Sequence, residues 1–110
     1  MADAADHRGF AERLRERAGG DGGLTPADLR KAALKRAAGG EVLPDPYDEL
    51  VQQIGDASYR VTDAQVARVR DAAGSDKAAF EIVMAAAIGA ALMRFDEAMS
   101  ALGKAVDEAR

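Results

Sequence analysis

Residues 76–107 read DKAAFEIVMAAAIGAALMRFDEAMSALGKAVD, and this stretch decides the fold. Its large apolar side chains recur every three or four residues, which is the spacing of one face of an α-helix. Ser75 stands before the stretch in the position of a helix N-cap. We therefore predict one long helix that carries most of the core through a stripe formed by Phe80, Met84, Ile88, Leu92, Phe95, Met99, Leu102 and Val106.

A second face of the same stretch holds small residues, among them Ala85 and, four positions later, Gly89. A glycine inside a helix costs about 1 kcal/mol relative to alanine, so close packing is the best reason for Gly89. The chain has 26 alanines, which bury little area, and the core of one copy is expected to be thin. We therefore predict a homo-oligomer interface that contains Ala85, Gly89 and Met93.

The residues before this stretch mark the ends of further helices. Thr62 and Gln65 have the spacing of a capping box, and Gly74 is a typical C-terminal stop. Thr25-Pro26 and Asp45-Pro46 each place a cap residue before a proline, as at the start of a helix. No segment has the alternation of a strand. We predict an all-α fold, a compact domain of about four helices that ends in the long Ala/Gly-rich helix and is completed by oligomerisation.

The N-terminal residues differ from the rest of the chain. Residues 4–18 can form a short helix, but Phe10 and Leu14 are its only large apolar residues, and four arginines surround them. Residues 19–23 read GGDGG, which is typical of a flexible linker. We predict a flexible basic arm and linker over residues 1–23 and a helical domain over residues 24–110.

Composition and charge exclude several classes of function. The chain of 110 residues has no cysteine, so it holds no disulfide, thiolate metal site or cysteine nucleophile. Its one histidine, His7, has no partner at a ligand spacing, and we expect neither a metal nor a cofactor. Residues 41–110 carry seven basic and thirteen acidic residues, which argues against a nucleic-acid partner.

We also expect no membrane segment. The longest apolar run, residues 82–93, is flanked by Glu81 and Arg94 and is shorter than the roughly 20 residues that a membrane helix needs. The N-terminus lacks the apolar region of a signal peptide. The expected location is the cytoplasm.

Glu81, inside the apolar run, has two interpretations. Lys77, one turn earlier, can pair with it at the surface. If Glu81 instead points into a cleft, desolvation would raise its pKa and suit it to acid–base chemistry. Arg94, further along the same helix, would pair across a subunit boundary or with Glu97.

Three pieces of sequence occur in a familiar order. These are ASYRVTD at residues 57–63, AAGS at residues 72–75, and FEIV at residues 80–83 followed by three alanines and Gly89. Over about residues 43–102 the chain resembles the carboxymuconolactone decarboxylase and alkylhydroperoxidase-like superfamily. The resemblance implies an all-α fold that assembles into a trimer or hexamer.

The chain departs from that family at the redox motif. The two cysteines of the peroxidase members correspond to Tyr59 and Thr62, and their histidine corresponds to Val66. A thiol peroxidase needs a thiolate, so this chain lacks that activity. Asp48 or Glu49 would correspond to an acidic residue of the family's relay. Without the cysteines and the histidine, that relay has no chemistry in this chain.

Three functions remain open from the sequence. The first is a cysteine-less, homo-oligomeric scaffold or small-molecule-binding protein. The second is a lyase of the decarboxylase type, with Tyr59, Glu49 and Glu81 as candidate catalytic residues and Tyr59, Thr62 and Arg94 as candidate ligand-binding residues. The third is a module whose N-terminal arm binds another protein; deletion of residues 1–23 would then spare the stability of the domain.

Overall fold

The computed structural model describes residues 4–110, and these residues form an all-α fold without a β-strand. The predicted fold class is therefore confirmed. The elements are α1 (Ala4–Ala18), α2 (Ala27–Ala37), α3 (Tyr47–Ala57), the 3-10 turn η1 (Ser58–Arg60), α4 (Asp63–Ala73) and α5 (Asp76–Glu108).

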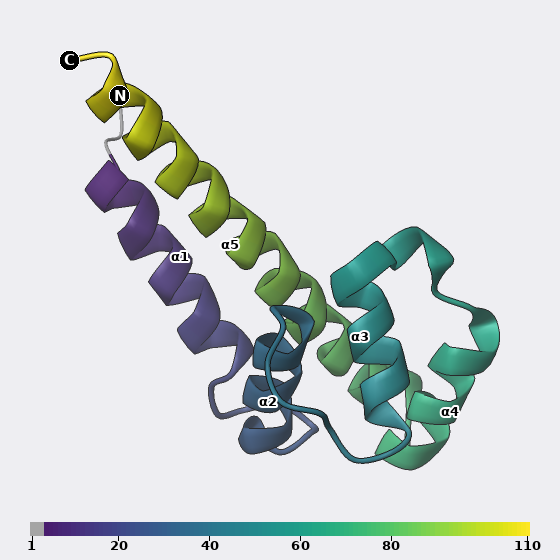
Figure 1. Ribbon diagram of the computed structural model, residues 1–110. Helices are drawn as coiled ribbons and strands as arrows, with labels where there is room; N and C mark the ends of the chain where they lie inside the picture. Colours follow the sequence, from purple (N-terminus) through teal and green to yellow (C-terminus); the bar gives the residue numbers. More distant parts are fainter. Residues whose placement is uncertain (1–3) are drawn as a thin grey trace.

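Helix α5 runs the length of an elongated molecule that measures 54 × 29 × 23 Å (Figure 1). Helices α2, α3 and α4 surround its first half and form the bundle. Helix α1 lies along its second half, so that the start of α1 and the end of α5 lie at the same end of the molecule. We call the antiparallel pair of α1 and the second half of α5 the hairpin, although these two helices are not consecutive in the chain.

The helix ends follow the local sequence in most places. Thr62 caps α4 in a complete capping box with Gln65, and the side chain of Ser75 accepts a hydrogen bond from the Ala78 amide at the start of α5. Gly74 ends α4 with a φ of 100°, a conformation that glycine adopts without strain. The predictions that Thr25 caps α2 and that Asp45 caps α3 are wrong. Pro26 and Pro46 stand at the N-caps of these helices, neither of which has a side-chain cap bond, and the Thr25 hydroxyl donates to Glu81.

The small face of α5 forms the core of the single chain. Ala85 and Gly89 are buried there, next to α2. A Cβ atom at Gly89 would lie 2.0 Å from the carbonyl oxygen of Leu34 in α2, so only glycine permits this approach. The prediction that Ala85 and Gly89 face other copies is therefore wrong, because α2 already covers them. Met93 is half-buried.

The stripe of large apolar residues on α5 is, by contrast, mostly outside the core. Phe80 is 61% exposed, Leu102 57% and Val106 46%, while Leu92 is buried. The prediction that this stripe carries the core is wrong along most of its length. The small residues of α5 occupy the core because the α2 backbone can pack directly against them. Larger side chains at these positions would keep the two helices apart.

Helix α1 packs against α5 and α2 of the same chain. Ala11 is buried, and the Arg15 guanidinium lies 2.6 Å from the carboxylate of Asp96 on α5. The rings of His7 and Phe95 meet edge to face with centroids 6.3 Å apart. The described part of the expected arm is thus a docked helix, and residues 1–3 lie outside the described residues. A division of the chain near residue 24 stays a prediction.

Candidate functional site

Glu81 on α5 holds the chain that leads into α2. Its carboxylate accepts hydrogen bonds from the Leu24 amide at 2.6 Å, the Thr25 amide at 2.8 Å and the Thr25 hydroxyl at 2.7 Å. The bond from Leu24, with those from Thr25 and the charge of Arg30, holds the pKa of Glu81 below its usual value despite partial burial. Glu81 is therefore an ionised anchor. The interpretation that it is a general acid with a raised pKa is wrong.

Arg30 of α2 lies beside this anchor and is only 6% exposed. Its Nη1 donates to the Ala18 carbonyl at 3.1 Å, and its Nη2 donates to the Thr25 carbonyl at a long 3.5 Å. Its Nε has no hydrogen-bond partner among the described residues. A buried guanidinium that lacks an acceptor is costly, so this atom calls for an explanation.

A cleft of about 180 Å³ opens where α1, α2 and α5 meet at this anchor. We call it the Arg30 cleft. Arg17, Arg30 and Glu81 supply its charged lining, and Phe80, Met84 and Ile88 supply an apolar wall on α5. The exposed fractions of Phe80 (61%) and Met84 (42%) show that this wall faces solvent.

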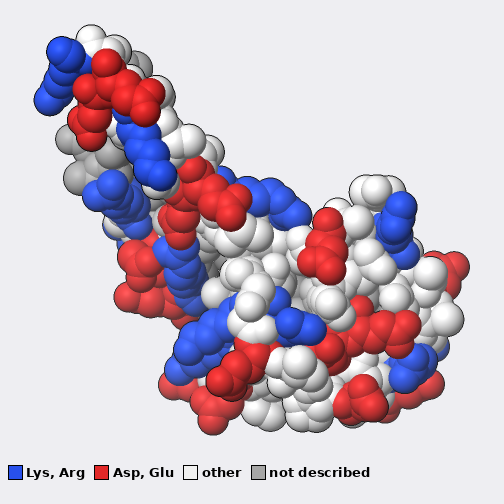
Figure 2. All heavy atoms as spheres, in the orientation of Figure 1, with Lys and Arg blue, Asp and Glu red and all other residues white. Residues whose placement is uncertain are grey.

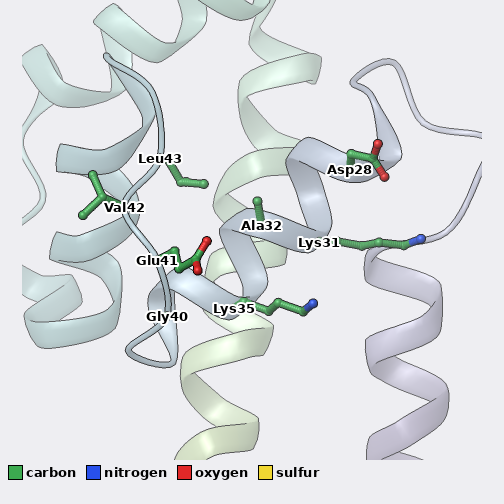
Figure 3. A pocket seen from close by; sticks show the side chains of 8 residues that line it. All are labelled: Asp28, Lys31, Ala32, Lys35, Gly40, Glu41, Val42 and Leu43. Carbon is green, nitrogen blue, oxygen red and sulfur yellow. The ribbon is translucent and has the colours of Figure 1, made fainter.

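A larger hollow of about 560 Å³ lies between α2 and residues 40–43 (Figure 3). Asp28, Lys31, Lys35 and Glu41 are its charged residues. Figure 3 shows that Lys31 and Lys35 extend toward α1, away from residues 42 and 43. The charges of this hollow are mixed in sign and do not converge on one point, so it has no evident chemistry.

Asp48 holds residues 40–43 against α2. Its carboxylate lies 2.7 Å and 3.3 Å from Nε and Nη2 of Arg36 and accepts from the Leu43 amide at 2.9 Å. The bond from Arg36, followed by that from Leu43, lowers the pKa of Asp48. These contacts make Asp48 a structural clamp, and they leave no place for it in a proton relay.

The candidate catalytic residues do not meet within one chain. Tyr59 is 83% exposed, with the Arg60 guanidinium 5.7 Å from its ring centroid. Glu49 is exposed and lies 2.6 Å from the guanidinium of Arg68 on α4. Neither Tyr59 nor Glu49 lines the Arg30 cleft beside Glu81.

The remaining candidate residues have structural contacts. Thr62 is the cap of α4, as described above. Arg94 donates through Nη2 to the Gly55 carbonyl at 2.7 Å and so ties α5 to the end of α3. The sequence suggested that Arg94 pairs with Glu97 or across a subunit boundary. The bond to Gly55 is neither of these, because it depends on how α5 packs against α3.

Sequence reasoning missed Arg30, although a signal was present. Arg30, Ala33 and Ala37 are the buried residues of α2, and their spacing of three and four places all of them on one face. An arginine in line with core alanines would have marked a buried charge.

Two structural findings bear on metals and membranes. The described residues contain no group of three or more histidines, cysteines or carboxylates that could hold a metal ion. Helix α5 is long and apolar enough to cross a bilayer, but the core helix of a soluble protein meets the same criteria. The structure is compatible with a soluble protein.

Comparison of the chain with protein-family models, curated proteins and solved structures yields no match.

Proposed function

We propose that the chain is a cysteine-less relative of the carboxymuconolactone decarboxylase and alkylhydroperoxidase-like superfamily. It acts as a cytoplasmic homo-oligomer, a trimer or hexamer, that serves as a scaffold or binds a small molecule without thiol-peroxidase chemistry. Support for the family comes from the sequence motifs, the all-α architecture and the long last helix. Support for self-association comes from the surface of the hairpin.

The observation that carries the proposal is the apolar surface that the hairpin leaves open. Phe10 of α1 is 59% exposed, and Leu102 and Val106 of α5 are 57% and 46% exposed. Leu102 and Val106 are four residues apart and share one face of the helix. All residues from 101 to 110 are exposed, although α5 stays helical as far as Glu108.

A second copy of the chain is the occupant that this surface fits best. Two packed helices bury little area, and most helical stability in proteins comes from the packing of an apolar face. Hairpins of three copies that pack through Leu102 and Val106 around a common axis would cover each other's apolar face. Acidic and basic side chains are interspersed along the hairpin (Figure 2), which suits pairing with an identical surface.

The proposal is tested with two variants of α5 that add the same charge on opposite faces. Leu102→Glu places a carboxylate in the proposed interface and should reduce the mass in solution toward 11.5 kDa. Ser100→Glu, two residues away on the other face, should keep the mass of the parent protein. Sedimentation equilibrium measures both. Equal masses for the two variants would contradict the proposed interface.

The decarboxylase-type enzyme has no support from the single chain, because Tyr59 and Glu49 lie outside the cleft that Glu81 lines. The partner-binding arm is likewise not favoured, since α1 is docked on α5 through Arg15 and Ala11.

A further inference from the structure

We propose that the seam between α1 and α5 binds a small, uncharged aromatic molecule. A pocket of about 290 Å³ opens there between residues 7–14 of α1 and residues 91–95 of α5, and we call it the seam pocket. The inference rests on the small-molecule binding proposed above and adds a site and a ligand class to it. It does not rest on self-association, because both sides of the pocket belong to one chain.

The size of the seam pocket follows from the residues that line it. Ala11 (3% exposed) and Leu92 (7% exposed) form its buried floor, and Phe10, Leu14 and Phe95 supply large apolar walls. A volume of about 290 Å³ is at the lower end of the range for small-molecule pockets. A ligand of one or two rings therefore fits this space.

The lining of the seam pocket favours a ligand without charge. No Asp, Glu, Lys or Arg side chain among the described residues lines it. The Arg30 cleft and the hollow between α2 and residues 40–43, by contrast, each have three or more such side chains in their linings. An ion in the seam pocket would lose part of its hydration without gaining a counter-charge, which costs free energy.

Three aromatic rings line the seam pocket and favour an aromatic ligand. The sequence has three phenylalanines and one histidine, and Phe10, Phe95 and His7 are three of these four residues. The rings of His7 and Phe95 already meet edge to face, with centroids 6.3 Å apart. Phe10 is 59% exposed and so has ring surface that a ligand ring can cover. An aromatic ligand would extend this cluster and gain more than a saturated ring of the same size.

His7 supplies the one polar side chain of the lining. It is exposed, and its ring nitrogens can donate to or accept from a ligand. Small-molecule sites commonly combine an apolar lining with a few polar groups that orient the ligand. The ligand class is therefore a small aromatic ring that carries one hydroxyl or N–H group.

The test compares three single-ring probes, namely phenol, cyclohexanol and benzoate. Two-dimensional carbon–proton NMR at about pH 8, above the range in which histidines usually titrate, follows the methyl signals of the parent protein. Phenol should bind about threefold more tightly than its saturated counterpart cyclohexanol, through ring contacts. It should bind about tenfold more tightly than benzoate, whose charge has no partner in the pocket.

The position of the response is part of the same test. The methyl signals of Ala11, Leu14, Ala91 and Leu92 should move most on addition of phenol, because these residues line the pocket. Equal affinity for phenol and benzoate, or for phenol and cyclohexanol, would overturn the proposal. A response centred elsewhere in the chain would overturn it too.

A variant that fills the seam pocket keeps the test independent of folding. Ala91 lines the pocket and is exposed, so Ala91→Leu adds bulk there without a buried clash. This variant should weaken phenol binding by about tenfold. Ala101→Leu, at an exposed position of the same helix outside the lining, is the matched control and should bind phenol as the parent does. Equal affinities of the two variants for phenol would overturn the proposal.

The Leu102→Glu variant separates this proposal from self-association. Leu102 lies outside the lining, so this variant should bind phenol as tightly as the parent does, whatever its mass in solution. Phenol binding by Leu102→Glu alone would show that a second copy of the chain fills the pocket in the parent protein, and it would overturn the proposal.

Discussion

At the scale of single residues, two glycines determine how closely the helices pack. A Cβ atom at Gly89 would lie 2.0 Å from the Leu34 carbonyl oxygen, and one at Gly55 would lie 2.4 Å from the Ala37 carbonyl oxygen. Both clashes are with backbone atoms of α2, which cannot rotate away as a side chain can. The α2 helix is therefore held by α5 and α3 through contacts that no other residue type permits.

Alanine substitution within α5 tests this packing. Gly89→Ala should lower the free energy of unfolding by about 1–3 kcal/mol or more, because α2 must move to admit the methyl group. Gly103→Ala is the matched control, since a Cβ atom there meets nothing within 4 Å. It should stabilise the protein by up to about 1 kcal/mol through helix propensity. Chemical denaturation measures both, and equal effects would contradict the close approach.

The charge of Glu81 gives a second prediction at this scale. Its folded-state pKa is below the ordinary 4.5, so ionisation stabilises the fold above that pH, and the stabilisation is lost as the pH falls through the folded value. Glu81→Gln should therefore cost about 1–3 kcal/mol at pH 7 through weakened hydrogen bonds. The difference from the parent should shrink below about pH 4.5.

Denaturant unfolding at pH 7 and at pH 3.5 measures this difference. Glu97→Gln, an exposed position on the same helix, serves as the control and should change stability little. A cost for Glu81→Gln that stays constant between the two pH values would show that the carboxylate charge is not what holds the chain before α2.

At the scale of elements, α1 belongs to the fold. It buries Ala11 and forms the Arg15–Asp96 ion pair, and it provides part of the Arg30 cleft through Arg17 and Ala18. Deletion of residues 1–23 should lower the melting temperature by several degrees, since a loss of 1 kcal/mol shifts it by about 4–8 °C in a domain of this size. Differential scanning calorimetry checks this. An unchanged melting temperature would support the arm that the sequence suggested.

Local sequence signals predicted the helix ends well and the packing faces poorly. Caps such as Thr62 and Ser75 act on backbone groups within one turn, so they can be recognised in the sequence. Which face of α5 lies in the core depends on where α2 packs. The sequence around Gly89 is compatible with close packing against a helix of the same chain or of another copy, and it does not distinguish the two. The contact of Arg94 with Gly55 and the docking of α1 likewise depend on tertiary packing.

The candidate site was only partly accessible to sequence reasoning. Glu81 stood out because it interrupts an apolar run, and the structure places it in a charged cleft. Its partners Leu24 and Thr25 are more than 50 positions away in the chain, and no spacing rule connects them. The direction of its pKa shift follows from those partners, so the sequence alone could not decide between a surface pair with Lys77 and a desolvated acid with a raised pKa.

At the scale of the whole molecule, the chain combines a bundle with a dense small-residue core and a hairpin with an open apolar face. The bundle is packed through α2, α3 and α5, whereas the last residues of α5 have no cover from the described part of the chain. Self-association through the hairpin would complete this half of the molecule. It is the central claim of the proposed function.

The mass of the unmodified protein in solution shows whether the chain self-associates. Multi-angle light scattering, with the protein eluted at several concentrations, should give three or six times 11.5 kDa. A mass of 11.5 kDa at every concentration would contradict the account, because the exposed apolar face of α1 and α5 would then remain open to water.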